Sequence, residues 1–357
     1  MNTFDFYRVE CPKCHGQLNS VAPLIGQTLC PFCGTGYHIT ANMNKEAEMP
    51  EQIVPFATLV GDFEESAWKM LVNEDYAPVN ISRLISFEGA KGVYLPVFFY
   101  EGKYECAWSC EIRQKPTDTG TEKNPKDIYR PQNGVSKGEY SMVCVAYEGV
   151  ELDKELANYV RTLQYRGEGV SLFLPQYLNN YLFLIRNRDD RQTWKQWGED
   201  TLNNMVMKNT LMQMQNNEVR DFKCSVTSGG TGEGKFIFYP VWMLNYQYDG
   251  ELHHIFMDGT GRNGVRGTTL IDRTLKARAE KPFTILKFIA VAAVIIPFLL
   301  LLASWYKAAI IALLAMGLVF FGYRIYARWH KRRVIDKARV KRGKSFEYKV
   351  WGLKFEI

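Results

Sequence analysis

Four cysteines near the start of the chain have the type and spacing of a metal site. They form two Cys-x-x-Cys pairs, Cys11/Cys14 and Cys30/Cys33, separated by fifteen residues. Two such pairs at this spacing are typical of tetrahedral zinc coordination by thiolates. Because four protein ligands leave no open coordination position, we predict a structural Zn²⁺ site within a zinc ribbon at residues 8–40.

The residues around these cysteines support the same interpretation. Gly16 and Gly34 follow the two pairs, and glycine lets the backbone curl so that amides point at sulfur. His15 and His38 are either spare ligands or surface residues, and we expect the latter. Redox dithiols are the alternative for the cysteines. Thiolates require a reducing compartment, which predicts a cytoplasmic location for this end of the chain.

The net charge of +6 is distributed unevenly along the 357 residues. From Arg324 onward there are 12 Lys and Arg against three acidic residues, or +9, which leaves −3 for the preceding part. A uniformly basic body that binds nucleic acid is therefore disfavoured. The apolar content of 46% excludes a disordered chain, and eight Cys are too few for a disulfide scaffold.

The fold class expected from the sequence is multidomain, with an N-terminal zinc ribbon, an α+β cytoplasmic domain and a C-terminal transmembrane α-hairpin. Residues 41–52 are polar and predict a linker, and residues 53–270 predict the α+β domain. Two antiparallel hairpins are expected in it, with turns at Glu101-Gly102 and Asp249-Gly250.

Helices are predicted after Asp62, at about 151–165 and at about 190–216. The segment 114–139 is rich in Lys, Pro, Gly and Thr, which predicts a long surface loop.

Two glycine-rich stretches resemble nucleotide-binding motifs but have the wrong context. Gly229–Lys235 fits G-x-x-x-x-G-K, yet Phe236 stands where Ser or Thr would bind magnesium, and a strand-like segment follows. Gly259–Gly264 fits G-x-G-x-x-G, but it also lies between strand-like segments, so that no helix N-terminus faces a phosphate. We therefore predict two turns and no nucleotide.

The remaining cysteines and histidines are interpreted as structural side chains. Cys106 and Cys110 lie four residues apart on one face of a strand, too far for a disulfide, and are either buried thiols or a second metal site. Buried thiols are the preferred interpretation, also for Cys144 and Cys224. His253 and His254 point to opposite faces of a strand. No catalytic set is legible, so we predict no enzyme.

Residues 283–326 predict two transmembrane helices, at about 284–303 and 308–326. Each contains an uncharged run of 16 residues, and flanking residues extend both runs to a spanning length. Pro297 is expected to kink the first helix. The alternative is a buried hairpin of a soluble domain.

Basic residues on both flanks, with Lys307 alone in the turn, place both termini in the cytoplasm. Residues 327–357 predict a basic cytoplasmic tail, whose end at 345–357 alternates like a strand. Tail residues beside a membrane helix favour lipid contacts. Those expected to bind membrane lipids are Arg328, Lys331, Arg332 and Arg333.

Several motifs together resemble a family of bacterial zinc-ribbon membrane proteins that are often labelled as relatives of a primosomal helicase. The segments concerned are the two cysteine pairs, Val54–Phe56, Gly92–Val97, Tyr239–Trp242, Tyr248–Gly250, Met257–Gly261 and the membrane pair. The family commonly has Asn-Gly-x-Thr-Gly where this chain has the shorter Asp258–Gly261. The resemblance implies a bacterial cytoplasmic-membrane protein that accompanies SPFH-domain or phage-shock-protein-A-type envelope-stress proteins.

Three functions follow as hypotheses. The first is a non-enzymatic membrane adaptor, or scaffold, that recruits or organises SPFH or envelope-stress proteins. The alternative is a membrane-tethered nucleic-acid-binding protein that uses the ribbon and the tail, including Arg332 and Lys341. The third is an enzyme with an unrecognised pocket in residues 53–270, which no motif supports.

Overall fold

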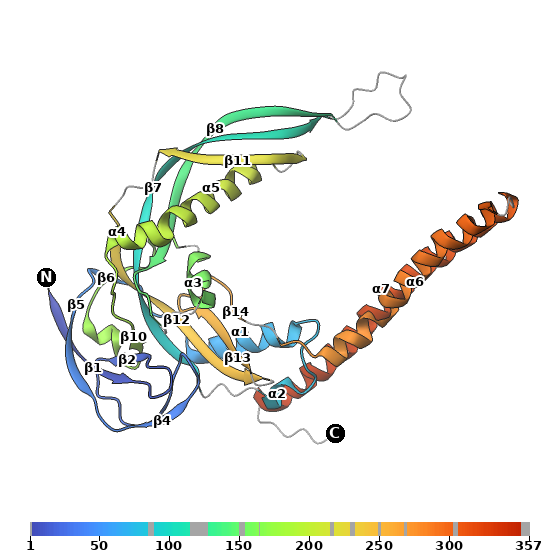
Figure 1. Ribbon diagram of the computed structural model, residues 1–357. Coiled ribbons are helices and arrows are strands. Elements are labelled where there is room, and N and C mark those ends of the chain that lie inside the picture. Colours follow the sequence, from blue (N-terminus) through green and yellow to red (C-terminus); the bar gives the residue numbers. More distant parts are fainter. Residues whose placement is uncertain are drawn as a thin grey trace. The chain divides into compact units, whose positions relative to one another are not determined.

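The computed structural model describes residues 2–84, 89–114, 128–149, 154–163, 165–214, 218–228, 233–248, 251–267, 270–302 and 306–350. They form two compact units (Figure 1). The first comprises Met1–Phe63, Gly89–Asn245 and His254–Gly267, and the second comprises Glu64–Glu88, Tyr246–His253 and Thr268–Ile357.

The first unit is built on a twelve-stranded mixed sheet, and a separate two-stranded sheet lies beside it. The strand order along the main path is β14-β13-β12-β7-β10-β2-β1-β5, while β6, β8, β9 and β11 pair off this path. The strands of the large sheet are β1 (Thr3–Glu10), β2 (Gln17–Ser20), β5 (Met43–Glu48), β6 (Gln52–Ile53), β7 (Lys91–Gln114), β8 (Ile128–Val145), β9 (Ser171–Leu172), β10 (Leu182–Phe183), β11 (Val219–Ser228), β12 (Lys235–Tyr248), β13 (Glu251–Asp258) and β14 (Arg266–Gly267). The small sheet contains β3 (Gly26–Leu29) and β4 (Gly36–Ile39).

Strand β7 runs without interruption through the Glu101-Gly102 pair, where the sequence predicted a turn. Gly102 lies directly opposite Tyr140 of β8. A side chain at Gly102 would approach the ring of Tyr140 to 3.0 Å, so the glycine leaves room for an aromatic ring and does not bend the chain.

The same packing explains why much of the predicted loop at 114–139 is strand β8. Gly134 and Gly138 of β8 lie opposite Trp108 and Tyr104 of β7, whose rings cover them. Glycines that resemble loop residues in the sequence are here cross-strand partners of aromatic side chains. Residues 115–127 lie outside the described part of the chain.

The polar segment at 41–52, predicted as a linker, contains strand β5 and the start of β6. β5 pairs antiparallel with β1 over six residue pairs, including Phe4 with Ala47, and both of these side chains are buried. The second hairpin prediction is confirmed by neighbouring strands β12 and β13, although Asp249 and Gly250 lie outside the described residues.

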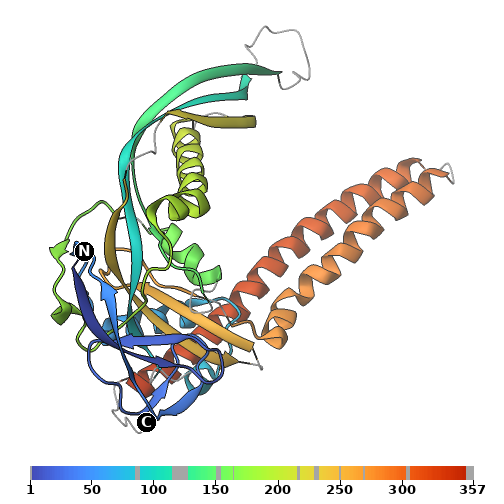
Figure 2. The same ribbon diagram turned by 60° about the vertical axis from the view of Figure 1, so that its left-hand side comes forward.

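Short helices cover parts of the sheet of the first unit. They are α3 (Lys154–Arg161), the 3-10 helix η1 (Pro175–Leu178), α4 (Asp190–Thr193), the π-helical turn η2 (Trp194–Gly198) and α5 (Glu199–Gln213). The two helical predictions in this region are thus confirmed. Asp189 is the N-cap of α4, and its side chain accepts a hydrogen bond from the backbone amide of Gln192. Leu202 and Val206 of α5 pack against the aromatic face of β7 and β8, beside which α5 lies in Figure 2.

The second unit is helical apart from the tip of the β12–β13 hairpin. It contains most of α1 (Val60–Asn73), α2 (Ile81–Leu84), α6 (Arg273–Leu302) and α7 (Tyr306–Val350). α6 and α7 lie side by side as an antiparallel pair (Figures 1 and 2). The predicted strand at 345–357 is wrong for residues 345–350, which continue α7, because extending a formed helix costs less than starting a new pairing. Residues 351–357 are outside the described part.

Candidate metal centre

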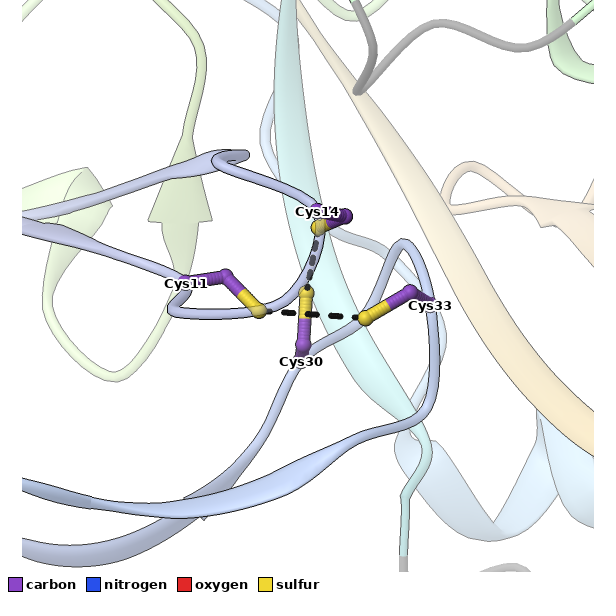
Figure 3. A group of neighbouring side chains, drawn as sticks. All are labelled: Cys11, Cys14, Cys30 and Cys33. Carbon is purple, nitrogen blue, oxygen red and sulfur yellow. Dashed lines mark hydrogen bonds between the residues drawn. The ribbon is translucent and has the colours of Figure 1, made fainter.

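The four predicted ligands come together at one point. The sulfur atoms of Cys11, Cys14, Cys30 and Cys33 all lie within 4.8 Å of one another. Figure 3 shows the two pairs facing each other, with Cys11 Sγ 3.8 Å from Cys33 Sγ and Cys14 Sγ 3.7 Å from Cys30 Sγ. A tetrahedral ion with sulfur at about 2.3 Å requires sulfur–sulfur distances of about 3.8 Å. The side chains therefore already have the spacing that a four-thiolate metal ion needs.

Two equivalent turns present these sulfurs. The first connects β1 to β2 and the second connects β3 to β4. In each turn the amide of the first cysteine donates to the carbonyl five residues later, at 2.9 Å for Cys11 and 3.0 Å for Cys30. The residue after the second cysteine donates back to the first cysteine, at 2.9 Å in both turns. The two cysteine pairs thus lie in turns with the same backbone hydrogen bonds.

The sequence predicted a glycine at the left-handed backbone position of each cysteine turn, and this holds for only one of the two turns. Gly34 has φ +70°, as a glycine at this point allows, but in the first turn His15 takes this conformation with φ +58°. The His15 ring lies 2.7 Å from Glu10 and is exposed, and His38 is also exposed. Neither ring belongs to the group of four ligand atoms.

The thiols differ in how readily they ionise. Burial raises the pKa of Cys30 strongly and the pKa of Cys14 to about 11. At Cys33 burial acts in the same direction, but hydrogen bonds with the hydroxyl and amide of Thr35 and with Cys14 and Cys11 together outweigh it and lower the pKa to about 7. The hydroxyl lies 3.3 Å from the sulfur. A cation would supply the remaining charge compensation that the buried sulfurs need as thiolates.

The cysteine turns share a core with the large sheet. Cys11, Cys30 and Phe32 lie in the same buried cluster as Val93 and Leu95 of β7. The site is therefore an integral part of the first unit, whereas the sequence predicted a separate ribbon joined by a linker.

A support for the second turn comes from residues that the sequence analysis missed. Asn245 on β12 donates through Nδ2 to the carbonyl of Pro31, and its Oδ1 lies 2.6 Å from Nδ1 of His254 on β13. Only the pairing of β12 with β13 brings these side chains to the turn, over 200 residues away in the sequence. No local signal could have identified them.

The remaining cysteines are distributed through the sheet. Cys106 and Cys144 are buried in one cluster with aromatic residues of β7 and β8, and the half-buried Cys224 packs against that cluster. Cys110 is buried in a different cluster. Cys106 Sγ lies 3.6 Å from the hydroxyl of Thr210. Among the described residues, only the four N-terminal cysteines form a group able to hold a metal ion.

The two glycine motifs have the strand context that the sequence predicted. Residues 229–232 of the first motif lie outside the described part of the chain, between β11 and β12. Lys235 begins β12, and its ammonium group lies 2.8 Å from the Glu101 carboxylate. The Gly259–Gly264 turn is organised by the buried carboxylate of Asp258, which accepts from the Tyr239 hydroxyl at 3.0 Å and the Asn263 side chain at 2.8 Å. Gly261 has φ +73°, as expected for a glycine turn.

Two helical segments, Arg273–Phe298 and Ile310–Arg342, are long and apolar enough to cross a membrane. Most of their described apolar side chains are not buried: Phe288, for example, is 72% exposed and Leu318 is 77% exposed. A buried hairpin of a soluble domain would have covered them. Pro297 lies inside α6, which continues to Leu302.

Part of the predicted basic tail is engaged within the second unit. Arg342 is fully buried and donates to three carbonyls. That of Val72 lies in the last turn of α1, and those of Glu74 and Ala77 follow the helix. Arg339 lies 2.7 Å from Asp75.

The four predicted lipid contacts separate into two groups. The ammonium group of Lys331 lies 5.5 Å from the centre of the Tyr76 ring, and this side chain is half-buried. The other three, Arg328, Arg332 and Arg333, are exposed.

Comparison with known proteins gives no relative: no family model, curated protein or solved structure matches this chain.

Proposed function

We propose that this chain is a non-enzymatic membrane adaptor whose cytoplasmic part is stabilised by structural zinc. The observation that supports it best is the combination of two features. One is a closed set of four cysteines inside the core of the first unit, and the other is a helical pair with exposed apolar side chains. A closed four-cysteine site would stabilise the fold, and an apolar helical pair would anchor the chain in a membrane. Neither feature provides a group that could react with a substrate.

Zinc is the metal that fits these residues. Four thiolates with tetrahedral spacing favour zinc or iron–sulfur chemistry over hard cations, and the two-turn arrangement is that of structural zinc sites. Zinc bound there would neutralise the thiolates and fix both turns. Because all four positions are filled by protein, substrate has no access to the ion.

The resemblance of the sequence motifs supports a location in the bacterial cytoplasmic membrane, with both termini in the cytoplasm. A membrane-impermeant maleimide tests the orientation in intact cells. Lys307→Cys, in the first turn of α7, is expected to react from outside, whereas Lys341→Cys reacts only after the cells are opened. The opposite pattern would show that the orientation is reversed.

The proposed partners are SPFH-domain or phage-shock-type envelope-stress proteins. The test is affinity purification of the tagged full chain in mild detergent, beside an unrelated two-helix membrane protein with the same tag. Enrichment of such a partner only with this chain is the expected result. A clean preparation with equal recovery in the control would contradict the adaptor proposal.

A membrane-tethered nucleic-acid-binding protein is the second candidate. The observation in its favour is that residues 324–342 contain nine Lys and Arg and one acidic residue, Asp336. It predicts salt-sensitive binding of DNA or RNA that weakens in the double variant Arg332→Gln/Lys341→Gln. Absence of binding at low salt would remove it.

A further inference from the structure

We infer that the base of the helical pair has a binding surface for anionic phospholipid headgroups that extends only a short way along the helices. It is formed by Arg328, Trp329, Arg332 and Arg333 of α7 and Lys287 of α6. The inference rests on the proposed membrane insertion. It adds which cations face lipid, which do not, and the class of lipid that they recognise.

The first step concerns the two faces of α7. Ala327, Ile335, Ala338 and Arg342 are buried and share one face at 100° per residue. Trp329 lies on the opposite face and is 53% exposed.

Aromatic and basic groups meet on this outward face. Tyr326, one turn before Trp329, is 46% exposed, and the guanidinium of Arg333 lies 5.0 Å from the centre of the Trp329 ring. An exposed helical face of aromatic residues with basic flanks is the pattern of helices that contact a membrane interface.

The second step separates the structural cations from the others. Arg339 and Arg342 bind the end of α1, and Lys331 lies against Tyr76. Arg328 and Arg332 are exposed and, at 100° per residue, lie between the buried face and Trp329. Their charges are therefore available to a ligand outside the protein without breaking the contacts that hold α7 to α1.

The third step is depth along the helix. Arg324 is the first charged residue after the apolar segment of α7, and a helix rises about 1.5 Å per residue. Trp329 then lies about 7 Å beyond the hydrocarbon boundary and Arg332 about 12 Å beyond it. The headgroup layer is roughly 5–8 Å thick, which places Trp329 within it.

The direction of α7 extends the reach of these side chains. Helical side chains lean toward the N-terminus of their helix, and the N-terminus of α7 is its membrane end. Arg328 and Arg332 therefore lean toward the headgroups. Lys287 directly precedes the apolar residues of α6 and reaches the same layer from the neighbouring helix.

The same rise per residue places the last exposed lysines of α7 too far from the membrane to contact headgroups. Lys337 and Lys341 lie about 20 and 26 Å beyond Arg324, more than a Debye length from the headgroups at physiological salt. A nucleic acid would use these exposed cations as well, whereas a membrane surface would not. This difference provides the matched control.

The experiment uses the full chain reconstituted into vesicles of phosphatidylcholine and phosphatidylglycerol in equal amounts. One lipid at a time is brominated near the headgroup, and quenching of tryptophan fluorescence is recorded. The contribution of Trp329 is the difference between the wild type and Trp329→Phe. We expect the brominated anionic lipid to quench this contribution more than the brominated zwitterionic lipid.

The double variant Arg328→Gln/Arg332→Gln is expected to weaken this preference, since each charge near an anionic surface contributes about fivefold to local enrichment. Lys337→Gln/Lys341→Gln is expected to keep it. Equal quenching by both lipids in the wild type, no contribution from Trp329, or equal loss in both double variants would overturn the inference. Vesicle flotation is measured in parallel, because a chain that fails to float contradicts membrane anchoring itself, whereas one that floats without lipid preference contradicts only this inference.

Discussion

The side-chain amide of Asn245, on strand β12, donates a hydrogen bond to the carbonyl of Pro31, which lies between two cysteines of the candidate metal site. His254 on the neighbouring strand lies 2.6 Å from the other end of the same amide. Side chains from two strands of the large sheet thus contact a turn of the candidate metal site near the N-terminus.

Asn245→Ala is expected to weaken zinc binding about tenfold while leaving the stoichiometry unchanged, because the turn loses a support but keeps its four thiolates. Competition with a chelating dye measures the affinity. Asn203→Ala, at an exposed position of α5, is the matched control. Equal affinities in both variants would show that the Asn245 bond does not support the site.

Cys30→Ser is expected to lower bound zinc from about one ion per chain to near zero and to lower the melting temperature of the first unit, because Cys30 is part of its core. Metal analysis by mass spectrometry and thermal unfolding measure the two effects. Cys110→Ser changes a buried thiol in another cluster and is expected to retain zinc. Unchanged zinc content in Cys30→Ser would refute the ligand assignment.

Gly134→Ala is expected to destabilise the β7–β8 hairpin by about 1–3 kcal/mol, although alanine has the better strand propensity. The added Cβ would lie 2.6 Å from the ring of Trp108. Hydrogen exchange along β7 measures the effect. Gly264→Ala meets no atom within 4 Å and is the neutral control.

The double variant Gly134→Ala/Trp108→Ala separates the steric cause from a backbone effect. If the ring is the obstacle, adding Gly134→Ala to Trp108→Ala costs little further stability. A full additive loss would instead assign the effect to the backbone.

Arg342→Met is expected to cost about 3 kcal/mol, because the carbonyls of Val72, Glu74 and Ala77 lose a charged donor in a buried place. Faster hydrogen exchange at the end of α1, in detergent micelles, is the measurement. Lys341→Met alters the exposed neighbouring residue and should leave that exchange unchanged.

The stability of the start of α6 is expected to depend on pH through Asp272. Its carboxylate accepts from the amides of Thr274 and Leu275 at 2.8 and 3.0 Å. Partial burial opposes ionisation, but the hydroxyl of Thr274 and these amides outweigh it and lower the pKa below its ordinary 3.8.

Because the folded-state pKa is the lower one, the carboxylate stabilises α6 fully above about pH 4, and the effect is lost as the pH falls through the folded-state pKa. Asp272→Ala is expected to remove about 1 kcal/mol at neutral pH and to abolish this dependence. Hydrogen exchange at Leu275 at about pH 6 and about pH 3 measures it. A variant that retains the wild-type pH response would contradict this role.

The sequence by itself determined the features with a local chemical signature. The spacing of Cys11, Cys14, Cys30 and Cys33 predicted the four-sulfur group, because each pair needs only its own short turn. Long uncharged runs likewise predicted the two apolar helices, since their composition sets their length. The strand context of the two glycine motifs also followed from neighbouring residues.

Tertiary structure decided what local sequence left ambiguous. Gly102 and Gly134 resemble turn residues until the rings opposite them are known, because a cross-strand neighbour depends on register. Asn245 reaches Pro31 only through the order of the strands. Arg342 belongs to the predicted basic tail, yet the fold buries it against carbonyls in the last turn of α1 and just after that helix. The physical reason is common to all three: a side chain's role depends on its partners, and distant segments supply those partners only when the chain folds.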